Sequence, residues 1–250
     1  VVKIPDSAGS FGNVSFDSRQ IADLSLSQLR QMLLSLLHAR GWRDAYPVQV
    51  GVWECDVLSS PSVQLWIPDE QDGPPVVEGI FEQVVRDSEG KFVGARPVDP
   101  PEPIKSRLVE EAFLIATLFQ KLGYFGRCSL DSIVAGMKYD TAELHWIECN
   151  GRWGGVSIPM TLANRFGLGK TMPGCVIVQQ SQPRSPVYST KHALRKLEGI
   201  LFDRKAPGPG IILLSPPDGI SSNWTNFMAV GTDQEMAENL AGEVMPRLQS

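Results

Sequence analysis

Polar and apolar residues alternate in two segments near the middle of the chain, 127–131 and 147–152. Successive side chains of a β-strand point to opposite faces of a sheet, so each segment read as a strand has one polar and one apolar face. In the second segment Glu148 and Asn150 share a face, which Arg152 joins if the strand extends that far. A fold that buries the apolar face must therefore leave these polar side chains together.

An antiparallel pairing of the two segments is predicted to set Asp131 opposite Glu148 and Ser129 opposite Asn150. One face then carries two carboxylates and an amide, while the other face packs on a helix. Clustered hard oxygen ligands suit Mg²⁺, which fills its remaining positions with water and phosphate oxygens. The same alternation also arises in an ordinary half-exposed strand pair, and these residues alone leave the two interpretations open.

The first residues of the chain add a second candidate element. Lys3 closes a short strand directly before the loop 7–12, in which Gly9, Ser10 and Gly12 allow backbone N–H groups to approach an anion. A lysine beside such a loop is typical of a polyphosphate clamp. Taken alone, the pattern equally fits a hairpin turn with a solvated lysine.

Glu54 follows the apolar strand 48–53, where the strand ends before Ser60 and Pro61. A carboxylate at this edge can accept hydrogen bonds from ribose hydroxyls. The alternative is a merely solvated glutamate, because exposed glutamates are common at strand ends.

Taken in order, these pieces resemble the ATP-grasp superfamily over about residues 1 to 166. The motifs that carry the resemblance are the lysine and glycine loop (3–12), the hinge strand (50–54), G-Y-F-G (123–126), D-S-I (131–133) and I-E-C-N-G-R (147–152). Within the superfamily, the chain is most similar to the pheganomycin-type peptide ligase group and its relatives.

The resemblance implies an α+β fold of two α/β subdomains, built on antiparallel sheets with flanking helices, and an ATP- and Mg²⁺-dependent carboxylate–amine ligase. Such enzymes phosphorylate a carboxylate with ATP, and an amine then attacks the acyl phosphate. The resemblance implies that Lys3 contacts the ATP phosphates and that Gly9, Ser10 and Gly12 close over them, while Glu54 contacts the adenine and ribose. It further implies that Asp131, Glu148 and Asn150 bind Mg²⁺. Arg152 is the implied catalytic residue, which steadies the phosphoryl group.

The chain also departs from the superfamily pattern. An earlier domain and a further lysine-bearing strand usually precede the segment that opens this chain, so we expect this chain to form only part of the active enzyme. Arg127 is a candidate substrate contact that matches no family role.

Composition narrows the function classes. The 250 residues carry a formal net charge of −5 and no long basic run, which argues against nucleic acid as the main ligand. The apolar runs are far shorter than the roughly 20 residues of a membrane helix. Four cysteines without a C-x-x-C pair indicate reduced thiols and a cytoplasmic protein. The expected partners are small-molecule carboxylate and amine substrates, and a homodimer is one option for the assembly.

Hydrophobic periodicity predicts the coarse organisation of the chain. Three parts are expected: a small ATP-grasp subdomain (1–56), a large subdomain with the metal site (57–180) and a small C-terminal α/β appendage (181–250). The expected strands lie near 1–4, 14–16, 48–53, 63–67, 76–85, 91–95, 125–134, 144–149, 211–214 and 227–230, and the helices near 25–41, 104–122, 159–166 and 233–248. A turn at 87–90 and a loop at 180–186 are also expected.

Two other functions remain open at this point. The chain could be a non-catalytic nucleotide-binding regulatory or scaffold domain that keeps the fold without ligation. A third option within the same fold is a carboxylase- or CoA-ligase-type activity. The complete set of Asp131, Glu148, Asn150 and Arg152 favours the enzyme, because a domain without catalysis has little need of a full metal face.

Overall fold

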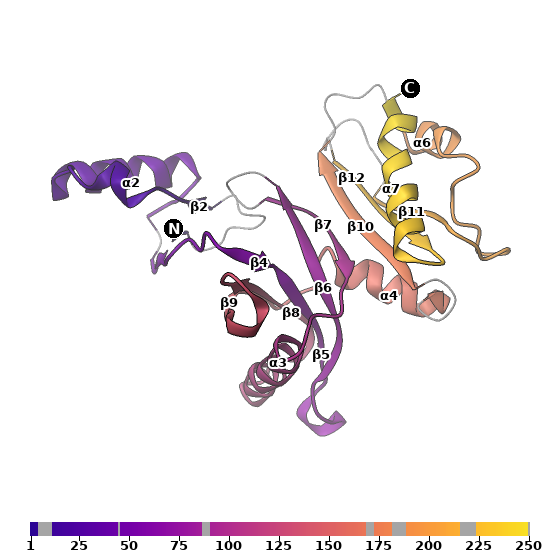
Figure 1. The fold of residues 1–250 in the computed structure, drawn as a ribbon, viewed down its shortest axis with the longest axis horizontal. Coiled ribbons are helices and arrows are strands. Elements are labelled where there is room, and N and C mark those ends of the chain that lie inside the picture. Colours follow the sequence, from indigo (N-terminus) through magenta and orange to yellow (C-terminus); the bar gives the residue numbers. More distant parts are fainter. Residues whose placement is uncertain are drawn as a thin grey trace. The chain divides into compact units, whose positions relative to one another are not determined.

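A computed structural model describes residues 1–4, 12–44, 46–86, 91–168, 173–181, 189–215 and 224–249. The chain divides into two compact units (Figure 1). The first unit contains residues 1–55 and 85–92, and the second contains residues 56–84 and 93–250. Each unit has its own hydrophobic core. The predicted turn at 87–90 lies outside the described residues, and the boundaries of the three predicted parts stay predictions.

The first unit is a small antiparallel sheet with two helices. Its strands are β1 (Val2–Lys3), β2 (Asn13–Val14) and β3 (Gln49–Val50), in the order β2-β1-β3, and its helices are α1 (Ser18–Ile21) and α2 (Leu26–Ala39). The core of this unit is formed by Val2, Ile4, Val14, Leu37 and Trp42. The strands are short, so β1 and β2 each contribute one residue, Val2 and Val14, to this core.

Helix α2 begins where the sequence predicts. The Ser25 hydroxyl accepts a hydrogen bond from the backbone N–H of Gln28, and the Gln28 side chain accepts one from the backbone N–H of Ser25. This reciprocal pair satisfies two donors that the first helical turn leaves without partners. The helix ends before Gly41, which has a φ of 85° and so adopts a backbone conformation that other residues avoid.

The second unit contains one sheet of nine strands. Their order is β11-β12-β10-β7-β6-β5-β8-β4, with β9 paired to β8. The bounds are β4 (Val57–Ser59), β5 (Pro61–Ile67), β6 (Val76–Arg86), β7 (Lys91–Pro97), β8 (Gly126–Ala135), β9 (Glu143–Asn150), β10 (Gly174–Ser181), β11 (Gly210–Ser215) and β12 (Trp224–Gly231). The strand pairs β5–β8 and β8–β9, which carry the candidate site, are antiparallel.

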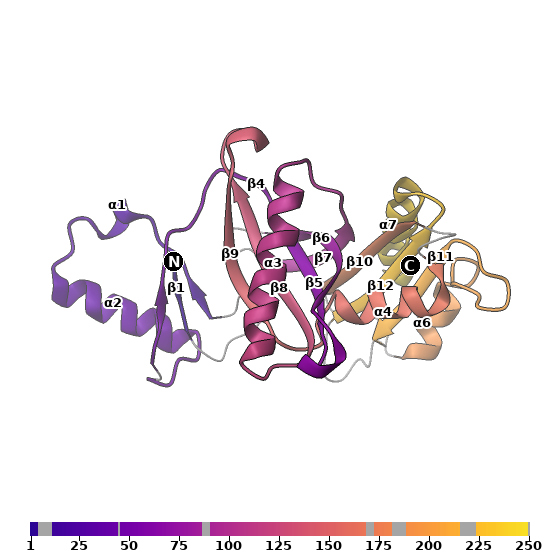
Figure 2. The ribbon, with the colours of Figure 1, turned by 90° about the horizontal axis from the view of Figure 1, so that it is seen from below.

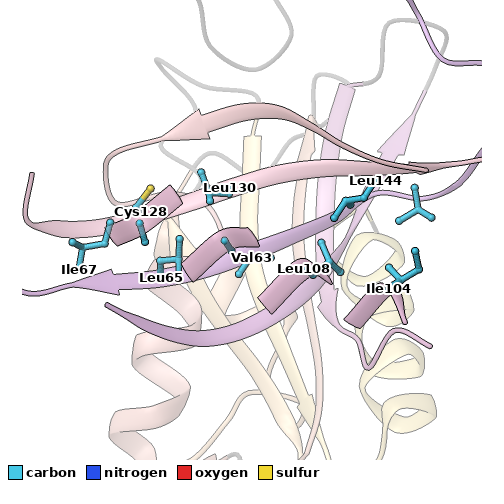
Figure 3. Close-up of a cluster of buried hydrophobic side chains, with 11 residues drawn as sticks. Val63, Leu65, Ile67, Ile104, Leu108, Cys128, Leu130 and Leu144 are labelled. Atoms are coloured by element: carbon cyan, nitrogen blue, oxygen red, sulfur yellow. The ribbon is translucent and has the colours of Figure 1, made fainter. Parts of the chain in front are cut away.

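Helix α3 (Ile104–Lys121) covers one face of this sheet, as Figure 2 shows. Its buried side chains pack on the apolar faces of β5 and β8, and Figure 3 draws this layer. The layer is made of Val63, Leu65, Ile67, Ile104, Leu108, Ala112, Ala116, Cys128, Leu130, Val134 and Leu144. Because strand side chains alternate, burial of this set leaves Arg127, Ser129 and Asp131 on the opposite face of β8.

Strand β10 was not predicted, although its β-branched run Val176–Val178 is a usable signal. It pairs with β12 on one side and with β7 on the other, so it joins the C-terminal strands to the rest of the sheet. A Cβ on Gly94 of β7 would lie 2.3 Å from the carbonyl oxygen of Ile177, so this junction needs glycine. Gln180 and Ser181 belong to β10, which corrects the predicted loop at 180–186, and residues 182–188 lie outside the described part.

The remaining helices cover the second half of the sheet or connect its strands. They are α4 (Ser157–Phe166), α6 (Thr190–Lys196) and α7 (Gln234–Gln249), with short 3₁₀ turns η1 (Glu70–Asp72) and η2 (Tyr139–Thr141). Helices α6 and α7 lie beside β10 to β12 in Figure 1, around a core that includes Leu197, Phe227 and Val244. In the described part of the chain, every helix is too short or too polar to cross a lipid bilayer.

Candidate active site

The predicted pairing of the two polar segments is confirmed. Asp131 of β8 lies opposite Glu148 of β9, and Ser129 lies opposite Asn150. The four side chains therefore share the sheet face that α3 does not cover. Glu148 is exposed, whereas Asp131 and Asn150 are half-buried.

A chain of hydrogen bonds connects this face across three strands. The Ser62 hydroxyl of β5 donates to Asp131 Oδ1 at 2.6 Å, and Asn150 Nδ2 donates to Asp131 Oδ2 at 3.2 Å. Arg152 Nη2 in turn donates to Asn150 Oδ1 at 2.8 Å. Both carboxylate oxygens of Asp131 thus accept hydrogen bonds. The Arg152 guanidinium is held by its bond to Asn150, and the residue is exposed.

Ser62 and Gln64 are members of the site that sequence reasoning missed. Both are buried, and Gln64 Nε2 donates to Ser62 Oγ at 2.9 Å, which orients the hydroxyl towards Asp131. Their positions follow from the register, because Ser62 lies opposite Asp131 and Gln64 lies opposite Ser129. The available signal was the alternation of Ser62 and Gln64 with three apolar residues along β5.

A β-bulge lies next to the two carboxylates. The register between β8 and β9 shifts after the Asp131–Glu148 pair, so that Ser132 lies opposite Trp146 and Ile147 is left as the extra residue. Beyond the bulge, Trp146 Nε1 donates to Glu111 of α3 at 2.9 Å. The bulge therefore lets β9 present Glu148 to one side of the sheet and still attach to the helix on the other.

The donor set fits a magnesium–nucleotide site better than a metal site built by protein alone. Among the described residues, no group of three or more histidine, cysteine, aspartate or glutamate side chains is placed to hold a metal ion. Mg²⁺ often needs only one or two carboxylates, since phosphate and water complete its shell. Asp131 and Glu148 supply such a pair, and the Asn150 carbonyl oxygen keeps a lone pair beside its bond to Arg152.

A buried ion pair occupies the same sheet face further along β8. Arg127 Nη1 contacts Glu78 Oε2, and the two side chains are only 12% and 20% exposed. The Arg127 guanidinium carbon lies 5.2 Å from the ring centroid of Trp66 and 5.1 Å from that of Trp153. Burial lowers the pKa of the Arg127 guanidinium.

Two thiols lie close together on β8 and β9. Cys128 Sγ and Cys149 Sγ lie 3.8 Å apart, and both residues are free cysteines. The hydrogen bond between them raises the pKa of Cys128, together with burial, and lowers the pKa of Cys149.

The predicted nucleotide-binding residues belong to the first unit. Lys3 ends β1, with Asn13 and Gln49 as its strand neighbours, and it lies half-buried on the side of β1 opposite Val2. Gly12 is buried directly before β2, and Ile4 donates a backbone hydrogen bond to its carbonyl oxygen. Glu54 is half-buried in the segment after β3. Gly9 and Ser10 lie outside the described residues, so their predicted role is untested.

Comparison with known proteins identifies the fold. No protein-family model matches the sequence, and no curated protein matches it either. Biotin carboxylase from Campylobacter jejuni, solved as a β,γ-ATP complex, is similar with a TM-score of 0.63 and 11% identity, covering 99% of this chain and 56% of that chain. N5-carboxyaminoimidazole synthetase from Staphylococcus aureus, complexed with ADP, has a TM-score of 0.54 and 8% identity, covering 97% of this chain and 60% of that chain.

A further solved structure, the ADP complex of the PurK N5-carboxyaminoimidazole ribonucleotide synthetase, has a TM-score of 0.51 and 11% identity. It covers 90% of this chain and 57% of that chain. The chain therefore spans between 56% and 60% of the length of these structures. The likeness confirms the predicted fold class: mixed α/β with antiparallel sheets and flanking helices, arranged as an ATP-grasp fold.

Proposed function

We propose that this chain belongs to an ATP-dependent ligase that activates a carboxylate and joins it to an amine. The observation that carries the proposal is the hydrogen-bonded series Ser62–Asp131–Asn150–Arg152 on the open face of an ATP-grasp sheet. An ordinary half-exposed strand pair has no need for a carboxylate held on both oxygens beside an arginine. The solved structures with this fold include complexes with ADP and with an ATP derivative, which supports ATP as the ligand class.

Asp131, Glu148 and Asn150 would hold Mg²⁺ in this proposal. The ion would supply positive charge to the phosphate oxygens of the nucleotide as the γ-phosphoryl group is transferred. Asp131 cannot swing away from this position without breaking its bonds to Ser62 and Asn150. The preorganised carboxylate avoids part of the reorganisation that would otherwise slow the transfer.

Arg152 would bind the transferred group on the other side. Its guanidinium is held at Asn150 Oδ1, and its Nη1 lies 3.5 Å from the carbonyl oxygen of Trp153. The exposed edge of the guanidinium is available to a phosphoryl or acyl-phosphate oxygen. Arginine suits this role because its planar donors match two oxygens of a phosphate or carboxylate.

The proposed reaction has two steps that balance. A carboxylate oxygen of the first substrate attacks the γ-phosphorus of ATP, and ADP leaves with formation of an acyl phosphate. The amine nitrogen of the second substrate then attacks the carbonyl carbon, a C–N bond forms, and phosphate and a proton are released. The amine is proposed to be that of an amino acid or peptide, as the resemblance to the pheganomycin-type group implies.

The residues of the first unit complete the proposal. Lys3 would contact the phosphates, Gly9, Ser10 and Gly12 would approach them through backbone N–H groups, and Glu54 would accept hydrogen bonds from the ribose. We further propose a cytoplasmic protein whose partners are small molecules rather than nucleic acid. These roles rest on the sequence pattern and on the fold.

Turnover with a panel of substrates tests the ligase. The chain is incubated with ATP, Mg²⁺ and amino acids, singly and in pairs, and phosphate release is followed. Turnover that needs both a carboxylate and an amine supports the proposal. ATP binding without any such turnover would instead indicate the non-catalytic nucleotide-binding domain.

Glu148→Gln tests the metal site within the same assay. The variant keeps the size and hydrogen-bonding capacity of the side chain and removes its charge, so turnover should be lost while the protein stays folded. Glu143→Gln is the matched control, because Glu143 is exposed at the other end of β9. Near-normal turnover of Glu148→Gln would refute the assignment of this carboxylate.

A further inference from the structure

Four side chains form a cluster beside the proposed active site that the proposed reaction does not use. The guanidinium of Arg127 lies over the rings of Trp66 and Trp153 and is paired with Glu78. The two indoles are 39% and 51% exposed, so the cluster reaches the surface although its charged centre is buried. A buried charge pair is expensive to desolvate and stabilises a fold poorly compared with apolar residues of similar volume. Stability alone therefore does not account for the arginine.

The fold assembles this cluster from four separate segments. Trp66 of β5 lies directly opposite Arg127 of β8. Glu78 is the extra residue of a second β-bulge, since the register of β5 and β6 shifts between Gln64–Gly79 and Leu65–Val77. Without that bulge, alternation would direct Glu78 to the apolar face, where Val77 packs instead.

Arg127 keeps a free hydrogen-bonding edge after its contact with Glu78. Among the described residues, neither of its buried atoms Nε and Nη1 has a hydrogen-bond partner, although Nη1 is in ion-pair contact with Glu78. Nε and Nη2 form the side edge of the guanidinium, whose two parallel N–H groups match the two oxygens of a carboxylate. The guanidinium carbon lies over the ring of Trp153, and this half-exposed indole offers an apolar surface beside the guanidinium.

The distance to Asp131 restricts what can bind there. Arg127 and Asp131 lie on the same face of β8, four residues apart, which corresponds to about 13 Å between Cα atoms. A small substrate together with one phosphoryl group can extend over a distance of this order.

We propose that Arg127, flanked by Trp66 and Trp153, binds the non-reacting carboxylate of an amino-acid substrate whose carbon side chain packs on Trp153. The inference rests on the proposed function and names the substrate class of the same site. An amino acid that acts through its amine must keep its own carboxylate away from the phosphoryl donor. Arg127 performs this separation, and Glu78 holds its other edge so that the Nε–Nη2 side faces the substrate.

Binding measured without turnover tests this role. Calorimetric titrations use the chain with Mg²⁺ and a non-hydrolysable ATP analogue, and compare glycine, L-alanine, L-leucine, L-phenylalanine and L-glutamate with their α-carboxamides. At least one amino acid is expected to bind about tenfold more tightly than its carboxamide, as suits a charge-assisted, two-point contact. Equal affinities for every pair would overturn the proposal.

The Arg127→Lys variant tests whether the carboxylate preference depends on the two-donor edge of arginine. Lysine keeps the positive charge beside Glu78 and lacks the two-donor edge, so the preference for the carboxylate should fall to about threefold or less. An unchanged preference in a folded variant would overturn the role of Arg127. Where Arg127→Lys does not fold, Trp153→Ala provides the test, because Trp153 is half-exposed. The affinity of the Trp153→Ala variant for the preferred amino acid should fall several-fold. An unchanged affinity for L-leucine and L-phenylalanine would overturn the proposal that the substrate side chain packs on Trp153.

Failure of this inference can be distinguished from failure of the ligase proposal. Glu148→Gln should retain the preference for the carboxylate over the carboxamide while it loses turnover. A carboxylate preference that depends on Arg127, in a chain without ligase turnover, would support the binding site alone. Ligase turnover without any carboxylate preference would refute the binding site alone.

Discussion

The two faces of β8 carry different kinds of side chain, apolar on one face and polar on the other. On one face Cys128, Leu130 and Val134 are at most 3% exposed and pack against α3. On the other face Arg127, Ser129 and Asp131 are half-buried, and two of them are held by residues of β5, β6 and β9. The apolar face needs only volume and burial, whereas each polar residue needs a particular partner at a particular register. Substitutions on the two faces should therefore fail in different ways.

The largest effect is expected on the apolar face. Leu130→Ala removes a buried side chain and leaves a cavity against α3, so the free energy of unfolding should fall by about 2–5 kcal/mol. Chemical denaturation measures this loss. Ser129→Ala, one position along the strand and on the other face, should change stability by roughly 0.5 kcal/mol or less. Equal losses for the two variants would show that the faces do not differ in their contribution to stability.

The next effect concerns chemistry on the polar face. Asp131→Asn should lower ATP turnover by about 100-fold, equivalent to about 2.7 kcal/mol in the activation free energy. Stability should fall by about 1–2 kcal/mol, because the asparagine oxygen still accepts the Ser62 hydrogen bond whereas its amide nitrogen faces the Asn150 donor. Phosphate release and thermal unfolding are measured on the same sample. Asp140→Asn, on the exposed turn η2, is the matched control. A turnover loss that merely follows unfolding would contradict the comparison.

A smaller effect is expected from the hydrogen bond by which Ser62 holds Asp131. Ser62→Ala removes the donor to Asp131 and leaves the buried Gln64 amide without that acceptor, which should cost about 1–2 kcal/mol of stability. Ser60→Ala serves as control, since the Ser60 hydroxyl makes only a long 3.4 Å contact with the Ser132 carbonyl oxygen. If both serine variants unfold alike in denaturant, the network centred on Asp131 does not depend on Ser62.

The smallest effect is a pH dependence at β6. Burial raises the pKa of Glu82 above its ordinary value of 4.5, although the backbone N–H of Ser60 and nearby Arg96 oppose the shift. A raised pKa in the folded state means that stability is present below the unfolded value and is lost as pH rises through the folded value. Relative to wild type, Glu82→Gln should therefore gain stability as pH rises, as thermal midpoints at several pH values would show.

Glu238 provides the opposite sign. Hydrogen bonding by Gln234 and by Arg96 lowers the pKa of Glu238, so its contribution is present above the unfolded value and is lost as pH falls. Glu238→Gln should thus lose a small amount of stability near neutral pH and none in acid. The same pH trend for both variants would contradict the assignment of burial as the dominant cause at Glu82.

Local pattern was sufficient for much of this structure. Alternation predicted both β8 and β9 and the pairing of Asp131 with Glu148, because register has a period of two and one face must be buried. The sequence predicted a helix near 25–41 with Ser25 or Ser27 as its cap, and the structure shows that Ser25 is the cap. The run that forms β10 was overlooked, since a short apolar segment between loops has no periodicity of its own.

The sequence by itself determined which residues face the core and which share the open face of β8 and β9, because these properties depend on near neighbours in the chain. Only the tertiary structure placed Ser62 opposite Asp131 on the neighbouring strand and brought Glu78, Trp66 and Trp153 into contact with Arg127. Those contacts depend on which strands are neighbours and on two bulges, at Glu78 and Ile147, that shift the alternation by one residue. The position of a bulge depends on packing across the whole sheet, so no local pattern in the chain predicts it.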